Sequence, residues 1–237
     1  TEEALFDYNF KNLGKEFDIS STTITLKYSP NSKNIMTSQG KYTYDQQFPE
    51  FYFNYEQGYK TLGGNLNFSR IDALISHNFK TKIGVTGVRL YGGLITGEAP
   101  IWKNFSMNGL GNSKAGFNFN LTSYLGFATM QGGQYYSDKF VGTYITHRIP
   151  WYFKSIGKNV SSFDLIYRGI IGDMKNPEFH QFEFQNLNHL YNEVGLEWNN
   201  FLSSQFNLGF FYRVGHYNTP GFKDNFAVQF KFKILGF

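Results

Sequence analysis

Long runs of alternating apolar and polar residues dominate this sequence. From Phe206 to Val214, an apolar side chain stands at every second position, and Asn207, Gly209 and Arg213 are among the residues between. Successive side chains of a β-strand point to opposite faces, so this period of two predicts strands with one apolar and one polar face. Similar rows predict about nine strands and an all-β fold. The rows fall at 22–28, 51–60, 70–79, 88–94, 141–151, 162–171, 193–198, 206–215 and 225–234.

The length of these rows separates two all-β classes. With their flanks they extend over roughly 9–15 residues, whereas strands of globular proteins average about five or six. A tilted strand that crosses a bilayer needs about 9–11 residues. A soluble β-sandwich shows the same alternation but seldom over such long runs. The rows therefore predict a transmembrane antiparallel β-barrel.

Composition excludes several other classes. The 237 residues include no Cys, which excludes a disulfide scaffold, a thiolate metal site and a cysteine nucleophile. Aromatic residues make up 20% of the chain, which argues against disorder. No segment approaches the roughly 18 apolar residues of a transmembrane helix. The net charge of +4 is spread without any Lys/Arg run, so we expect no nucleic-acid partner.

The connections between the predicted strands alternate in length toward the C-terminus. Short connections fall at 80–84, 151–159 and 200–204, and long ones at 98–138 and 173–189. Outer-membrane barrels have short periplasmic turns and longer extracellular loops. We therefore assign 17–237 to barrel strands, with 98–138 as a long extracellular or lumen-folded loop. Residues 1–16 have no clear pattern, and the start at Thr1 without Met suggests a processed chain or a fragment.

Charged residues gather on the face opposite the apolar rows. If the apolar rows face lipid, the charged rows face a lumen, where both signs of charge can pair across strands. Two interpretations remain open: a network of ion pairs that holds the barrel shape, or a selective aqueous path. The predicted lumenal set is Arg70, Asp72, Arg89, Asp164, Arg168, Glu193, Glu197 and Arg213, joined by Lys231 and Lys233.

No catalytic set is visible in the sequence. Glu193 and Glu197 lie about 13 Å apart along a strand, too far for the paired carboxylates of a glycosidase. The five His residues are isolated and lack metal-ligand spacing. No nucleophile elbow or phosphate-binding loop follows a predicted strand. We expect no catalytic, cofactor-binding or metal residues, no cofactor, and a protein that is not an enzyme.

The chain ends in Leu235-Gly236-Phe237. A terminal Phe with an apolar residue two positions earlier resembles the signal that the barrel-assembly machinery reads on outer-membrane proteins. Leu235 and Phe237 are therefore candidates for a C-terminal assembly signal. They share parity with Lys231 and Lys233, so either a β-bulge flips the face near the end or both residues lie at the rim.

Several segments, taken in order, resemble the C-terminal barrel of Bacteroidota outer-membrane proteins that carry a carboxypeptidase-like regulatory domain. These segments are 26–30 (LKYSP), 48–51 (FPEF), 55–59 (YEQGY), 92–100 (GGLITGEAP), 136–140 (YSDKF), 147–150 (HRIP) and 191–195 (YNEVG). That family is similar to the barrel-assembly and translocation superfamily. The resemblance implies that the nine strands are the C-terminal part of a sixteen-stranded barrel, with 98–138 folded into its lumen.

Two functions follow as expectations. The first is a non-enzymatic integral protein of the cell outer membrane, of assembly or translocation type, or a barrel subunit of an envelope complex. Its partners would be membrane lipid, the barrel-assembly machinery during insertion, and other outer-membrane subunits. The second is a small closed barrel that acts as a passive pore or a structural anchor. Val-Arg-Gly-Phe, a loop motif of the superfamily, is absent from 98–138.

Overall fold

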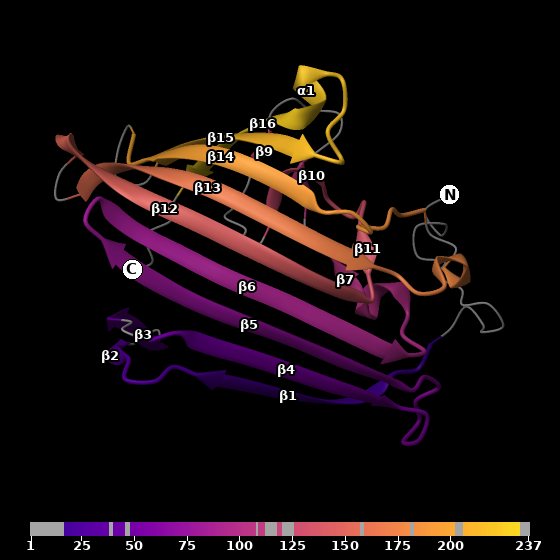
Figure 1. Cartoon of the computed structure of the whole chain (residues 1–237). Coiled ribbons are helices and arrows are strands. Elements are labelled where there is room, and N and C mark those ends of the chain that lie inside the picture. The colour runs from indigo at the N-terminus through magenta and orange to yellow at the C-terminus, as the bar shows by residue number, and fades with distance from the viewer. Residues whose placement is uncertain are drawn as a thin grey trace.

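Nine long strands form one antiparallel sheet in the computed structural model of the chain (Figure 1). The structure describes residues 17–37, 40–45, 48–107, 109–111, 118–119, 126–156, 159–180, 183–201 and 206–232. The strands are β1 (Ser20–Tyr28), β4 (Glu50–Tyr59), β5 (Phe68–Thr81), β6 (Gly84–Gly97), β12 (Lys139–Ile156), β13 (Asn159–Asp173), β14 (Tyr191–Asn199), β15 (Phe206–Gly215) and β16 (Phe226–Phe232). Each predicted row overlaps one of these strands, so the all-β prediction and the number of strands are confirmed.

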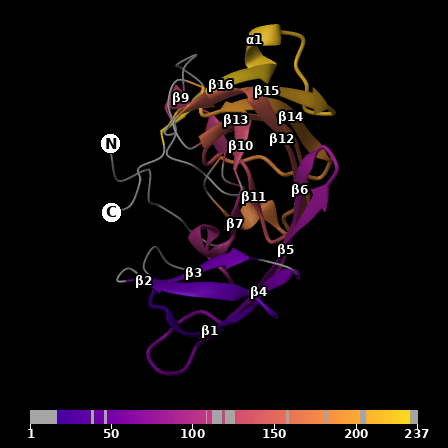
Figure 2. The same ribbon diagram turned by 90° about the vertical axis from the view of Figure 1, so that its left-hand side faces the viewer.

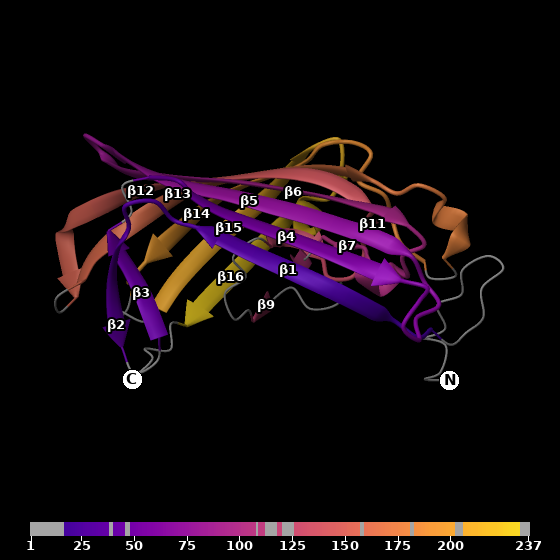
Figure 3. The ribbon, with the colours of Figure 1, turned by 90° about the horizontal axis from the view of Figure 1, so that it is seen from below.

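The sheet curves into an open trough (Figures 2 and 3). Each strand pairs with its neighbour in chain order, from β1 and β4 at one margin to β15 and β16 at the other. The far edge of β16 pairs in parallel with β9 (Asn118–Phe119). Among the described residues no pairing joins β16 to β1, so the sheet is not closed. No helix in this part of the chain is long and apolar enough to cross a bilayer.

The two faces of the sheet differ in chemistry. On the convex face, apolar side chains are exposed, with Val141 59% and Leu165 50% accessible. On the concave face, charged side chains are buried, with Arg168 8% and Glu193 fully inaccessible. The register explains the separation, because Arg168 lies opposite Glu193 and Leu165 opposite Leu196 on the adjacent strand. Period-two alternation thus becomes an apolar outside and a polar inside.

Several described parts of the connection between β6 and β12 lie inside the trough, where Figure 2 shows β7, β10 and β11. The short elements of the connection are η2 (Ile101–Lys103), β7 (Phe105–Ser106), β8 (Gly109–Gly111), β10 (Phe127–Gln131) and β11 (Tyr136–Ser137), together with β9 on the edge of β16. Phe105 and Phe127 join wall residues such as Phe140 and Tyr191 in the main apolar core. The core therefore lies between the concave face and this connection, which we call the inner segment (98–138).

One glycine makes close packing of the inner segment possible. A Cβ atom placed on Gly93 of β6 would lie 2.4 Å from the Phe105 ring. The ring lies against Phe140 on the next strand, with centroids 4.7 Å apart. Any larger residue at position 93 would have to displace this ring from the wall.

The two ends of the trough have different connections. At the turn end, two residues, Lys82 and Ile83, separate β5 from β6. At the opposite end, which we call the long-connection end, lie the inner segment's attachments, η3 (Pro177–Phe179) and the four-residue helix α1 (Phe222–Asn225). Between β1 and β4, the chain forms a hairpin of β2 (Lys33–Thr37) and β3 (Gly40–Asp45). Residues 1–16, Lys233, Leu235 and Phe237 lie outside the described residues, so predictions about them stay predictions.

Candidate functional site

The eight charged residues predicted for one face lie together on the concave face. Arg70 and Asp72 lie on β5, Arg89 on β6, Asp164 and Arg168 on β13, Glu193 and Glu197 on β14, and Arg213 on β15. Strand register aligns Arg168, Glu193 and Arg213 across three neighbouring strands. Asp164 and Glu197 form a second aligned pair. The alternation of side chains along each strand puts these residues on a common face. The register of the sheet then brings their charges within reach of one another.

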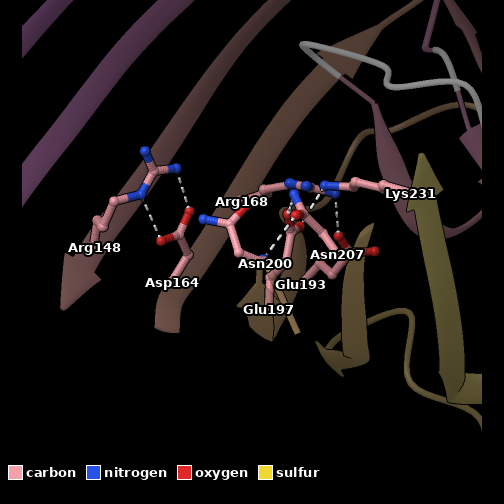
Figure 4. A network of polar contacts seen from close by, with 8 residues as sticks. All are labelled: Arg148, Asp164, Arg168, Glu193, Glu197, Asn200, Asn207 and Lys231. Carbon is pink, nitrogen blue, oxygen red and sulfur yellow. Dashed lines mark hydrogen bonds and ion pairs between the residues drawn. The ribbon is translucent and has the colours of Figure 1, made fainter. Parts of the chain in front are cut away.

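Three ion pairs form the centre of this concave network (Figure 4). Arg148 and Asp164 pair side by side, with Nε donating to Oδ1 at 2.9 Å and Nη2 to Oδ2 at 2.8 Å. Arg168 Nη1 donates to Glu193 Oε1 at 2.9 Å. Lys231 pairs with Glu197 from the last strand. Each of these carboxylates thus has a cation from an adjacent strand or, for Lys231, from two strands away.

Glu193 also holds the inner segment. Its Oε2 accepts hydrogen bonds from the backbone N–H of Thr129 at 2.7 Å and from the Thr129 hydroxyl at 2.8 Å. The same hydroxyl lies 3.0 Å from the Tyr191 hydroxyl. Glu193 therefore bridges Arg168 on the wall to β10 in the trough, and both of its oxygens are engaged.

A second attachment lies toward the β1 margin. Lys103 Nζ of the inner segment donates to Glu56 Oε1 at 2.5 Å, and Ser21 Oγ donates to the same oxygen at 2.9 Å. Nearby, the Arg70 guanidinium lies 4.5 Å from the centre of the Phe105 ring. The inner segment is thus bound by charge-assisted contacts to both halves of the sheet.

Arg213 takes part in a different contact. Its Nε donates to Asn225 Oδ1 at 3.0 Å and its Nη2 to the Asp224 carbonyl at 2.8 Å. The guanidinium therefore fixes the connection between β15 and β16 instead of pairing with Glu193. Sequence parity places Arg213 on the right face but does not identify its partner.

A cavity of about 470 Å³ opens beside the ion pairs. Charged groups from six strands line it, among them Arg89, Arg148, Arg168, Glu197 and Lys231. Its volume is within the range of small-ligand pockets, about 300–1,000 Å³. In the described part of the chain, no group of three or more His, Asp or Glu residues is placed to hold a metal ion.

Three participants in the network were missed from the sequence. Arg148 has the parity opposite to Ile145 and Ile149, so the alternation could have identified it. Glu56 likewise opposes Tyr55 on β4. Lys103 lies in the inner segment outside any regular strand, and no pattern in the sequence indicates its contact with Glu56.

The comparisons with known proteins cover part of this architecture. Residues 6–94 match a family model described as "Family of unknown function (DUF5686) C-terminal domain". Among the described residues, this match includes β1, β4, β5 and most of β6. The chain has no match among curated proteins. The family is uncharacterised, so the match carries no activity, substrate or partner.

Proposed function

We propose that the chain forms part of a non-enzymatic integral β-barrel of the cell outer membrane, of assembly or translocation type or a barrel subunit of an envelope complex. The observation that carries this proposal is the inverted distribution of the two faces. Rows of exposed apolar side chains cover the convex face, and paired charges fill the concave face. Water disfavours such a convex face, whereas acyl chains accommodate it.

Aromatic clusters on the convex face support a membrane location. Near the turn end, Trp151 lies against Phe163 and Trp198, with ring centroids 4.8 and 6.0 Å apart. Toward the long-connection end, Phe222 packs on Phe226 at 5.1 Å and on Tyr212 at 5.5 Å. Outer-membrane barrels carry aromatic girdles at both water interfaces, with an apolar band between them.

The open sheet supports a larger barrel of which these strands are a part. In hydrocarbon every backbone N–H and C=O must be paired, so a spanning sheet needs closure. Further strands beside β1 would supply it, in keeping with a sixteen-stranded barrel. The second candidate, a small closed barrel that acts as passive pore or anchor, is favoured by one observation: Phe105 and Phe127 of the inner segment pack against wall residues inside the trough.

In the proposed barrel, the inner segment and the concave network act together. The network pairs charges that would otherwise be costly at membrane depth, and its Glu193 and Glu56 hold the inner segment against the wall. Movement of that segment would open or close the polar interior. Membrane lipid, the barrel-assembly machinery and other outer-membrane subunits are the proposed partners.

Lipid contact can be tested with single cysteines, because the chain contains none. Leu165→Cys places a bimane label on the convex face, and Thr146→Cys places one on the concave face, where Thr146 lines the cavity. Thr146 is paired with Ile166, the immediate neighbour of Leu165. After reconstitution of the whole chain in liposomes, we expect brominated lipid to quench the label at 165 and leave the label at 146 unaffected.

Two results would refute the proposal. One is equal quenching at both positions, and the other is no quenching at position 165. Liposomes without bromine give the baseline for each label, and iodide in the aqueous phase reports whether position 146 is accessible to water. Access at 146 together with quenching at 165 would favour the aqueous path over a dry, filled interior.

A further inference from the structure

Another cavity lies outside the concave network, at the long-connection end. It has a volume of about 860 Å³. One wall comes from the turn after β10, residues 131–134, and the other from the connection between β13 and β14, at 177 and 183–186. The cavity is thus built where two connections, far apart in the sequence, meet.

Side-chain amides are the main polar groups of this cavity. They belong to Gln131, Gln134, Gln185 and Asn186. Glu183 is the one charged residue among the described residues that line it. Each amide offers two N–H donors and a carbonyl acceptor, so four of them present a dense set of neutral hydrogen-bonding groups.

Backbone and side-chain hydrogen bonds hold the two walls in place. Gln185 N–H donates to the Gln134 carbonyl at 2.8 Å, and Gln134 Nε2 donates to Gln185 Oε1 at 3.1 Å. The hydroxyl of Tyr217 donates to the Asn186 carbonyl at 3.0 Å. Burial raises the pKa of Tyr217, which keeps this donor protonated. The amides therefore lie on a fixed frame, which lowers the entropy cost of binding.

Two further features of the cavity point to a ligand. The buried Oδ1 atom of Asn186 has no hydrogen-bond partner among the described residues. Phe184 contributes an aromatic ring, which is held edge-on by Tyr136 at 5.9 Å and by His180 at 6.0 Å. Burial lowers the pKa of His180, so the imidazole beside Phe184 favours the neutral form.

We infer that this cavity binds a neutral carbohydrate. A sugar hydroxyl both donates and accepts, which matches amide side chains, and the C–H face of a pyranose packs on an aromatic ring. A phosphorylated or acidic ligand would meet Glu183, and no Arg or Lys is among the described residues that line the cavity. A purely apolar ligand would leave the amides unpaired, which costs free energy. The proposed membrane orientation puts the site outside the cell, but binding itself does not depend on it.

The test uses the whole chain in lauryl dimethylamine oxide, a detergent that contains no sugar. Maltotriose, cellotriose and triacetylchitotriose serve as neutral probes in saturation-transfer NMR, with sialyllactose as the acidic comparison. We expect at least one neutral trisaccharide to bind, and Gln185→Ala to weaken it by up to about tenfold. Phe184→Leu, which keeps an apolar side chain but removes the ring, should also weaken binding. Asn218→Ala, on the same end but outside the cavity, should leave it unchanged.

Three outcomes would overturn the inference. They are no binding by any neutral trisaccharide, binding that both cavity variants retain, and preferential binding of triglycine or adenosine in the same cavity. Gln131→Ala, on the opposite wall, gives a second variant if Gln185→Ala does not fold. Sugar binding without lipid quenching at position 165 would support this site and refute the membrane proposal, so the two failures are distinguishable.

Discussion

Replacement of Arg168 by alanine tests whether the concave network is a buried structural element. The Arg168 side chain pairs with Glu193 and also lies over the Phe211 ring, 4.8 Å from its centre. Its loss leaves the fully inaccessible Glu193 carboxylate with its hydrogen bonds from Thr129 but without the arginine that pairs with it. Removal of one partner of a buried ion pair costs about 3–5 kcal/mol. The two hydrogen bonds from Thr129 offset part of this cost, so we expect the lower end of that range.

The expected free-energy change can be converted into a melting temperature. For a chain of about this length, 1 kcal/mol shifts the melting temperature by about 2–4 °C, so 3 kcal/mol corresponds to a fall of about 6–12 °C. Tryptophan fluorescence of the detergent-solubilised chain during heating measures it. Lys60→Ala is the matched control, because it breaks an exposed pair with Glu98, 2.7 Å long. Such exposed pairs contribute about 0–1 kcal/mol.

A double variant without the two charges separates the ion pair from the packing of Arg168. Arg168→Met combined with Glu193→Gln removes both charges and keeps most of the volume, so the pair should lose less stability than Arg168→Ala alone. If Arg168→Ala lowers the melting temperature no more than Lys60→Ala does, Arg168 is solvated. The reasoning from burial would then be wrong, and an open aqueous interior would be the better description.

Two further variants test how the inner segment is held. Glu193→Gln places an amide N–H₂ opposite the donors of either Arg168 or Thr129. We therefore expect faster hydrogen exchange in β10 and unchanged exchange in β1. Equal rates in the variant and the native chain would count against this attachment. Gly93→Val forces the Phe105 ring off the wall and should cost about 1–3 kcal/mol of stability. The expected result is a lower melting temperature and faster proteolysis of the inner segment. Equal melting of the native chain and the variant would show that the ring is free to move.

The long strands could be predicted because their environment changes at every residue. On β13, Leu165 and Ile171 are exposed while Ile166 and Ile170 are buried, although all four are apolar. Apolar residues thus occur on both faces of β13. The alternation is visible in the sequence because the charged residues Asp164 and Arg168 share the inward face with Ile166 and Ile170. The short strands of the inner segment were not predicted. They contain two to five residues and depend on the concave face beneath them, so no local pattern specifies them.

The site was predictable as a face but not as a set of contacts. The alternation along each strand places Arg168, Glu193 and Arg213 on one face. The register of the strands sets Glu193 between the two arginines, so either one could pair with it. The structure pairs Glu193 with Arg168 because Arg213 reaches Asn225 on the following connection. The contact with Thr129 depends on where a long connection folds, which the strand pattern does not contain. Partner choice is thus decided by non-local packing.

The chemistry of β1 bears on what lies beyond it. Natural edge strands are usually short or protected by charges, prolines or bulges, because an exposed edge recruits other strands. β1 has nine residues in unbroken register with β4, and Lys27 is its one charged residue. Ile24 and Leu26 continue the convex apolar row, while Thr23 and Thr25 continue the concave polar row, up to the margin of the trough. The wall pattern therefore extends through β1 to the edge of the described sheet, and this supports the proposal that further strands lie beside it.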